Sequence, residues 1–281
     1  MRLLSAVRGV TTRHAATKRC IGFHQLVSLA LSSQWDHLLL HRGRWRGSFD
    51  TLADDLQPIK RQPSLLTLEP APAGVPLELT LLFWSNDPDP HDDPHQGEPV
   101  QTIRQSFHGP DRQLVFFPSG SFNRGSWQLA PMVRVHAEFG FLFRDRRHRL
   151  VLFWDGAGRF ERPVLIREHR DGSPAHEQPV LNADSLFGAW QGQRAELLST
   201  AGLSEPEISP CRVDLTEKDF EGLRWLPDGG AIRVPDSIQH REPLVIEAWW
   251  LAAPDRLERM ERVYDASGAW QCSRCLTLAR S

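Results

Sequence analysis

Apolar and polar residues alternate with a period of two along much of this chain. The clearest case is VRVHAEFGFLFR, residues 133–144. Its odd-numbered positions are apolar: Val133, Val135, Ala137, Phe139, Phe141 and Phe143. The charged and polar positions Arg134, His136, Glu138 and Arg144 would lie on the other face of an extended strand. The pattern predicts a strand with one dry face.

Further strand-like runs lie at residues 77–84, 113–118, 150–154 and 162–168. The segments PSGS, RDRRH and DGAG between them are rich in residues that tolerate tight hairpin turns. Neighbouring strands should therefore be antiparallel, and the spacing of the runs favours an all-β sandwich or barrel.

Helical spacing is limited to the start of this pattern. Trp35, Leu38 and Leu39 would share one face of a short helix, with Ser33 as its N-cap and Gly43 at its end. We expect one short helix before the first strand.

Two parts of the chain begin and end alike. Gly43, Trp45 and Gly47 recur with the same spacing as Gly188, Trp190 and Gly192. The ends also match, with Asp155, Gly158, Phe160 and Arg170 corresponding to Asp265, Gly268, Trp270 and Arg280. The repeat predicts an internal duplication, with barrels at residues 33–170 and 185–281 and a linker at residues 171–184.

Glycine on either side of a strand tryptophan permits close approach of a neighbouring backbone. At the closed base of an up-and-down barrel, such a tryptophan fills the bottom, and its indole N–H needs a polar partner. We therefore interpret Trp45 and Trp190 as structural residues and not as catalytic ones.

The first 32 residues differ from the rest, because they contain arginine, lysine, serine and threonine but no acidic residue. This composition is typical of a transit peptide, and it also fits a poorly ordered extension. We leave the segment out of the fold prediction.

Composition excludes several function classes. The formal net charge is only -2, and no basic run of the size that nucleic-acid binding needs occurs, so we expect no DNA or RNA partner. No apolar run is long enough for a membrane span. Cys20, Cys211, Cys272 and Cys275 are too scattered for a disulfide framework. Because the known catalytic motifs are missing as well, we predict no enzyme activity and no cofactor.

The segment NDPDPHDDPHQGEP, residues 86–99, brings carboxylates together with His91 and His95. These are competent ligands for a divalent cation, but Pro88, Pro90 and Pro94 would prevent a regular scaffold. We favour an acidic loop without a metal, which also offers an electrostatic contact for a partner.

Two features of the second repeat bear on binding. In RLERMERVYD, inward-pointing Arg259 and Glu261 would line a polar ligand cavity, whereas a bulged register would leave them solvated, and we favour the solvated arrangement. Trp249 and Trp250 must point to opposite faces of one strand. One of them therefore either packs between the two barrels, which we favour, or marks a partner surface.

The stretches SSQWDHLLLHRGRWRGSF, FFPSGSFNRGSWQLAPMVRVHAEFGF and RLVLFWDGAGRFERPVLIRE resemble a calycin-like family of unknown biochemistry found in cyanobacteria and plastids. The resemblance implies two consecutive antiparallel calycin- or lipocalin-like β-barrels. In the wider lipocalin group an arginine near the last strand packs over the base tryptophan. This implies Arg167 or Arg170 for Trp45, and Arg280 or Arg274 for Trp190.

A plant relative in this family helps to assemble the chloroplast ATP synthase. The resemblance thus implies a non-enzymatic assembly factor whose protein partners are subunits of the ATP synthase catalytic head. The alternative is a binder of bilin or another lipophilic molecule, because distant calycins are bilin lyases. The expected location is the cytoplasm of a cyanobacterium, or the chloroplast stroma if the first residues are a transit peptide.

Overall fold

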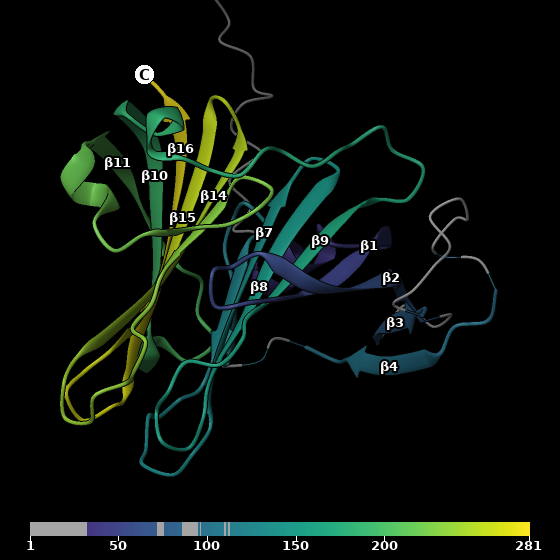
Figure 1. The fold of residues 1–281 in the computed structure, drawn as a ribbon, viewed down its shortest axis with the longest axis horizontal. Coiled ribbons are helices and arrows are strands. Elements are labelled where there is room, and N and C mark those ends of the chain that lie inside the picture. The colour runs from purple at the N-terminus through teal and green to yellow at the C-terminus, as the bar shows by residue number, and fades with distance from the viewer. Residues whose placement is uncertain (1–32, 72–75, 86–94, 96, 110, 112) are drawn as a thin grey trace, which may run out of the picture. The chain divides into compact units, whose positions relative to one another are not determined.

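Two antiparallel sheets and one short α-helix make up the described part of the chain (Figure 1). The computed structural model describes residues 33–71, 76–85, 95, 97–109, 111 and 113–281. Ser32–Ser281 form one compact unit. The predicted all-β fold, with antiparallel sheets after a short helix, is confirmed.

The first sheet has nine strands in the order β4-β3-β2-β1-β9-β8-β7-β6-β5. They are β1 (Gly43–Leu52), β2 (Pro58–Pro70), β3 (Leu77–Phe83), β4 (Gln101–Phe107), β5 (Leu114–Phe116), β6 (Phe122–Gly125), β7 (Val135–Phe143), β8 (Arg146–Trp154) and β9 (Val164–Arg170). The sheet curls, but within the described residues β4 and β5 are not paired with each other, so it is a half-barrel and not a closed one.

The second sheet has seven strands in the order β11-β10-β16-β15-β14-β13-β12. They are β10 (Gly188–Leu198), β11 (Glu207–Leu215), β12 (Arg224–Trp225), β13 (Gly230–Arg233), β14 (Leu244–Ala253), β15 (Arg256–Tyr264) and β16 (Trp270–Arg280). Short 3₁₀ turns lie at Ala183–Ser185, Ser199–Ala201 and Glu217–Phe220.

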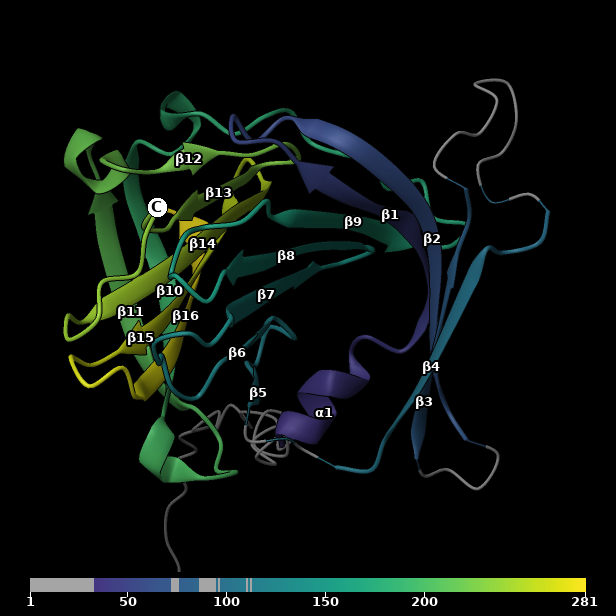
Figure 2. The same cartoon turned by 60° about the horizontal axis from the view of Figure 1, so that its bottom comes forward.

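The helix α1 (Gln34–Leu39) begins at a capping box. The Ser33 hydroxyl accepts from the Asp36 N–H at 3.2 Å, and the Asp36 carboxylate accepts from the Ser33 N–H at 2.8 Å. Gly43 does not end the helix as expected. It opens β1 with a φ of 112°, a backbone conformation that favours glycine, because the chain must turn sharply into the strand. Figure 2 shows α1 inside the curl of the first sheet, and Leu38 of this helix belongs to the same apolar cluster as Trp45.

Each sheet buries side chains on both of its faces, although the edge strands β4 and β11 are largely exposed. Between the two sheets lies a shared apolar core, which includes Phe139 and Phe141 of β7 with Ile246 and Trp250 of β14. The opposite face of the first sheet packs around Trp45 and α1, and that of the second sheet around Trp190. The predicted strand at residues 133–144 is β7, although it starts at Val135 and leaves Val133 53% exposed.

The hairpin turns after β8 and β15 are built alike. The Asp155 carboxylate accepts the backbone N–H groups of Ala157 and Arg159, both at 2.9 Å. The Asp265 carboxylate accepts the corresponding groups of Ser267 and Ala269 at 2.8 and 3.1 Å. These aspartates stabilise their turns as the sequence predicts.

Each turn also holds a loop of the other sheet. The Leu129 N–H donates to the Gly268 carbonyl at 2.7 Å, and the Ile238 N–H donates to the Gly158 carbonyl at 2.8 Å. A Cβ on Gly268 would lie 2.5 Å from the Leu129 carbonyl oxygen, so glycine is required for this close approach. Residues matched in the sequence repeat therefore make matching contacts between the sheets.

The segment between β9 and β10 carries the chain from the first sheet to the second. It contacts both sheets, because the Asp171 N–H donates to the Arg44 carbonyl and the Gly229 N–H donates to the Pro179 carbonyl, each at 2.9 Å. The expected division into residues 33–170, 171–184 and 185–281 stays a prediction about domains, and residues 1–32 lie outside the described chain.

Because the two sheets share one core, we expect them to unfold together. Replacing the fully buried Phe139 with alanine should lower the free energy of unfolding by about 3–5 kcal/mol. Hydrogen exchange read by mass spectrometry should show equal loss of protection in peptides from both sheets. The control is Ile103→Ala on β4, where the side chain is 40% exposed. Unchanged protection in β10–β16 would contradict a shared core.

Candidate functional site

Trp45 of β1 is fully buried and packs in the apolar cluster inside the first half-barrel. Its indole N–H donates to the His41 carbonyl at 2.7 Å. The Arg170 guanidinium carbon lies 4.4 Å from the centre of the indole ring, and its Nη1 donates to the Arg42 carbonyl at 2.9 Å. Arg147 approaches the same ring at 5.0 Å.

Trp190 has the same environment in the second sheet. Its indole N–H donates to the Leu186 carbonyl at 2.8 Å. The Arg280 guanidinium carbon lies 4.4 Å from the ring centre, and the Arg280 Nη1 donates to the Phe187 carbonyl at 2.9 Å. The tryptophan–arginine pairs implied by the family resemblance are therefore Trp45 with Arg170 and Trp190 with Arg280.

The geometry of the backbone explains the glycines that flank Trp45 and Trp190 in the sequence. A Cβ on Gly47 would lie 2.0 Å from the Arg167 carbonyl oxygen, and one on Gly192 would lie 2.0 Å from the Thr277 carbonyl oxygen. Gly188 has a φ of 106°, close to that of Gly43. No larger residue fits at Gly47 or Gly192 without moving a neighbouring strand, whereas Gly43 and Gly188 have a positive φ that favours glycine.

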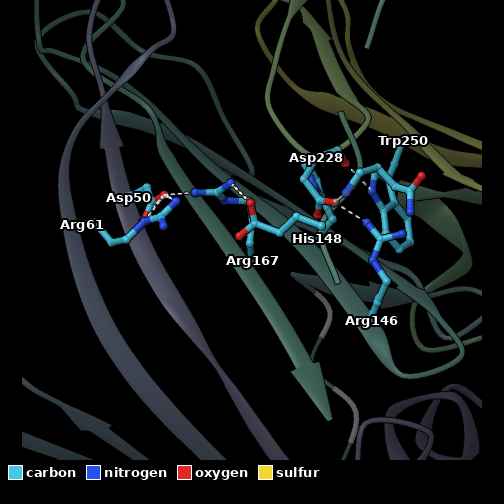
Figure 3. A network of polar contacts seen from close by, with 9 residues as sticks. Asp50, Arg61, Arg146, His148, Arg167, Asp228 and Trp250 are labelled. Carbon is cyan, nitrogen blue, oxygen red and sulfur yellow. Dashed lines mark hydrogen bonds and ion pairs between the residues drawn. The ribbon is translucent and has the colours of Figure 1, made fainter. Parts of the chain in front are cut away.

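Arg167 and Arg274 do not pack over the tryptophans. Arg167 points to the other face of β9, where it pairs with the buried Asp50 and with Glu177 of the connecting segment (Figure 3). Arg274 pairs with Glu196 at 2.6 Å and with Glu261 at 3.2 Å. An arginine three positions before Arg170 lies on the opposite face, since strand side chains alternate.

A second buried polar group joins β8 to the second sheet (Figure 3). Asp228 accepts hydrogen bonds from Arg146, from His148 Nδ1 at 3.3 Å and from the Gln178 N–H at 2.7 Å. The His148 ring stacks on Trp250 with centroids 5.7 Å apart, and the Trp250 indole N–H donates to the Asp228 carbonyl at 2.9 Å. This network fixes the connecting segment and both sheets to one another.

Burial lowers the pKa of His148, and its hydrogen bond to Asp228 opposes that shift only in part. Burial alone would raise the pKa of Asp228, but the hydrogen bond and charge of His148 and the charge of Arg146 leave that pKa below its ordinary value. Near neutral pH the pair is therefore a neutral imidazole that donates to a carboxylate.

Arg259 and Glu261 lie on the same face of the second sheet as Trp249, with Arg259 4.8 Å from that indole ring. A row of charged side chains of alternating sign crosses this face: Arg194, Glu196, Arg274, Glu261, Arg259, Glu247 and Arg233. Successive members lie 2.6 to 3.2 Å apart. We call this row the charge ladder.

The charge ladder corrects the prediction that Arg259 and Glu261 are solvated. Their side chains are only 21% and 12% exposed. They lie on the face of the second sheet that carries Trp190 and Trp249, which we call its inner face. The buried charges are compensated by one another, so this arrangement does not require the ligand that the sequence left open.

Trp249 and Trp250 are both fully buried, so neither is part of a partner surface. Trp249 packs in the core around Trp190, while Trp250 packs in the core between the sheets. Of the two alternatives that the sequence left open, packing of one indole between the two halves holds for Trp250. Their adjacent positions send them to opposite faces.

Most of the acidic segment at residues 86–99, including His91, lies outside the described residues. His95 is described, and its Nε2 contacts the Ser64 carbonyl at 3.1 Å and the Gly47 carbonyl at 3.3 Å. Among the described residues, no cluster of three or more histidine, cysteine or acidic side chains is arranged to hold a metal ion.

Burial raises the pKa of the Cys272 thiol on β16 to about 11, so this thiol is protonated near neutral pH.

The first half-barrel contains a cavity of about 120 Å³ that the sequence did not predict. One wall is apolar and includes Leu38, Leu66, Phe107 and Phe116. The other wall carries the charged side chains Arg124, Glu138, Arg147 and Arg149. This cavity combines an apolar wall with buried charge, so we treat it as the candidate functional site.

With the fold and this cavity described, comparisons with other proteins place the chain. Residues 31–173, just over half of the sequence, match the N-terminal domain of unknown function DUF3598. The chain belongs to the DUF3598 family. A DUF3598 protein of unknown function from Nostoc punctiforme PCC 73102 has a similar crystal structure, with a TM-score of 0.72 and 28% identity. The match covers 89% of this chain and 99% of that one.

The C-terminal part of this DUF3598 protein has a second match. Residues 203–281 match the C-terminal domain of the biogenesis factor required for ATP synthase 1. No curated protein matches the chain. In the described residues, no helix has the length and apolar character needed to cross a membrane.

The sequence did not predict the cavity of this DUF3598 protein, because its charged residues lie on strands with the alternating pattern of a strand that has one solvated face. In RRHRLVLFW, Arg147 and Arg149 share one face of β8, and Glu138 and Glu168 come from neighbouring positions on β7 and β9. Alternation alone cannot tell an inner polar face from a solvated one. The signal was the absence of any apolar residue on that face of β8 before Val151.

Trp45→Ala should lower the free energy of unfolding by about 3–5 kcal/mol, because a fully buried aromatic ring is lost from the base. Chemical denaturation measures this loss. Trp127→Ala is the matched control, since that side chain is 36% exposed and should cost less. Equal costs for the two variants would show that the base does not depend on Trp45.

His148→Gln should flatten the dependence of stability on pH. In the unfolded chain the imidazole gains a proton as the pH falls below about 6.5, whereas the folded chain resists protonation until lower pH. Stability is therefore lost on acidification below that value, by up to about 1.4 kcal/mol per pH unit for one such group.

Glutamine keeps a donor for Asp228 but does not titrate. Denaturation between pH 7 and pH 5 should thus show a shallower slope for His148→Gln than for the unaltered chain. His176→Gln, which replaces an exposed ring of the connecting segment, serves as the control. An unchanged slope in His148→Gln would mean that this imidazole is not held neutral.

Proposed function

We propose that this protein is an assembly factor that binds subunits of the ATP synthase catalytic head. The observation that carries the proposal is the match of residues 203–281 to the C-terminal domain of an ATP synthase biogenesis factor. These residues include β11–β16, which form most of the second sheet. The matched segment therefore supplies every strand of that sheet except β10.

We propose that it acts by binding and not by catalysis. The arrangement of charges in the second sheet supports this, because members of the charge ladder are engaged with one another across β10 and β13–β16. Such pairing gives a rigid inner face and leaves the outer edges of the sheet for contacts.

The edge strand β11 is the surface that we assign to the partner. In the described residues it pairs only with β10, so one side of its backbone is free. Its Ile208 is 54% exposed, and Leu203 just before the strand is 48% exposed. Exposed edges carrying apolar side chains are sites where other chains add, and partner binding protects them.

Two further points follow as part of this proposal. An assembly factor for ATP synthase would work in the cytoplasm of a cyanobacterium or in the chloroplast stroma, where the head is built. The matching turns and matching tryptophan–arginine pairs support an internal duplication of one calycin-like unit.

Ile208→Lys should weaken binding to purified ATP synthase head subunits, because a lysine on an edge strand opposes addition of another chain. We expect a loss of roughly tenfold or more, equivalent to about 1.4 kcal/mol, in surface plasmon resonance with immobilised α, β and γ subunits. Ile59→Lys, on β2 of the first sheet, replaces an equally exposed isoleucine (52%) and should bind as the unaltered chain does. Equal loss of affinity in both variants would contradict the assignment of the β11 edge as the contact. Absence of binding by the unaltered chain would contradict the proposed function.

A further inference from the structure

The polar wall of the first-sheet cavity carries an excess of positive charge. Arg124, Arg147 and Arg149 line it together with Glu138, and a second carboxylate, Glu168, pairs with Arg147 and Arg149. Arg147 lies 3.2 Å from Glu168, and Arg149 lies 2.6 Å from Glu138. Arg124 has no ion pair among the described residues, so one positive charge is left without a carboxylate.

The arginines also keep buried N–H groups that lack acceptors. Arg147 is only 4% exposed, yet its Nη1 has no hydrogen-bond partner. The Nε groups of Arg124 and Arg149 are likewise buried without partners. Buried donors of a charged group are costly when unsatisfied, so an acceptor that enters the cavity would be bound strongly.

The pKa of His41 is also affected by the positive charge in this cavity. Burial lowers the pKa of this cavity-lining imidazole to about 3, and the charges of Arg147 and Arg149 contribute to the shift. A neutral His41 adds no positive charge of its own. The excess charge therefore comes from the guanidinium groups.

The opposite wall suits a hydrocarbon group. It consists of leucine and phenylalanine side chains from six elements, α1 and β2 to β6, and includes Leu38, Leu66, Phe107 and Phe116. An adjoining space of about 210 Å³ shares Leu38, Phe107 and Leu114 and continues past Trp35 and His108. It lies where β4 and β5 leave the sheet open, so a chain longer than the cavity has room there.

We propose that this cavity binds a small amphipathic carboxylate, with its carboxylate at Arg124, Arg147 and Arg149 and its hydrocarbon part against the apolar wall. A net excess of one positive charge matches a monoanion. A phosphate dianion would instead meet Glu138 and Glu168 with an unbalanced charge. The proposal does not depend on a role in ATP synthase assembly.

The test is isothermal titration of the purified full-length chain at pH 7 with octanoate, 1-octanol and inorganic phosphate. We expect octanoate to bind, and 1-octanol and phosphate to bind at least tenfold more weakly, because each lacks one half of the recognised chemistry. Absence of octanoate binding, or equal binding of octanol, would overturn the proposal.

Substitutions of the cavity arginines test where the carboxylate of octanoate binds. Arg124→Met and Arg149→Met should each weaken octanoate binding by roughly tenfold or more, the effect expected for loss of one charge-assisted hydrogen bond. Arg124 has no ion pair to break, so its variant should keep the fold. Arg159→Met, which removes an exposed guanidinium paired with Asp155 outside the cavity, is the matched control and should leave binding unchanged. Equal affinity of the two cavity variants and the control would contradict the assignment.

Discussion

The packing of one sheet's apolar face against the other's is the constraint on which the rest of this structure depends. Phe139, Phe141, Ile246 and Trp250 are buried between the sheets, so the inner face of each sheet, which carries Trp45 or Trp190, and the sheet edges are left for other interactions. On each inner face the tryptophan is buried under an arginine. Charged side chains that are buried on these inner faces must find partners.

The two inner faces meet this requirement differently. In the second sheet the charge ladder pairs its members in sequence across the strands, and the face is braced by its own charges. In the first sheet Arg147 and Arg149 share Glu168, and buried donors are left over. The first half-barrel is therefore suited to a ligand, whereas the second is suited to a rigid surface for a protein partner.

Sequence alone predicted the elements well where local signals were strong. Alternation located β7, and the repeat of glycine, tryptophan and arginine located two buried tryptophans that each lie against an arginine. It failed for Arg259, Glu261 and the cavity arginines, because alternation assigns a residue to a face but does not say whether that face meets solvent or a core. Trp249 and Trp250 are a case where alternation sufficed, since it predicted their opposite orientations, and the favoured packing of one indole between the two halves holds for Trp250.

The central functional claim is that this DUF3598 protein holds subunits of the ATP synthase head. The most direct measurement is affinity purification of the tagged full-length chain from a cyanobacterium, read by mass spectrometry together with an absorption spectrum. The account predicts recovery of α, β or γ subunits with a colourless protein. Recovery of a bilin-coloured protein without those subunits would contradict it and would favour a chromophore-binding role.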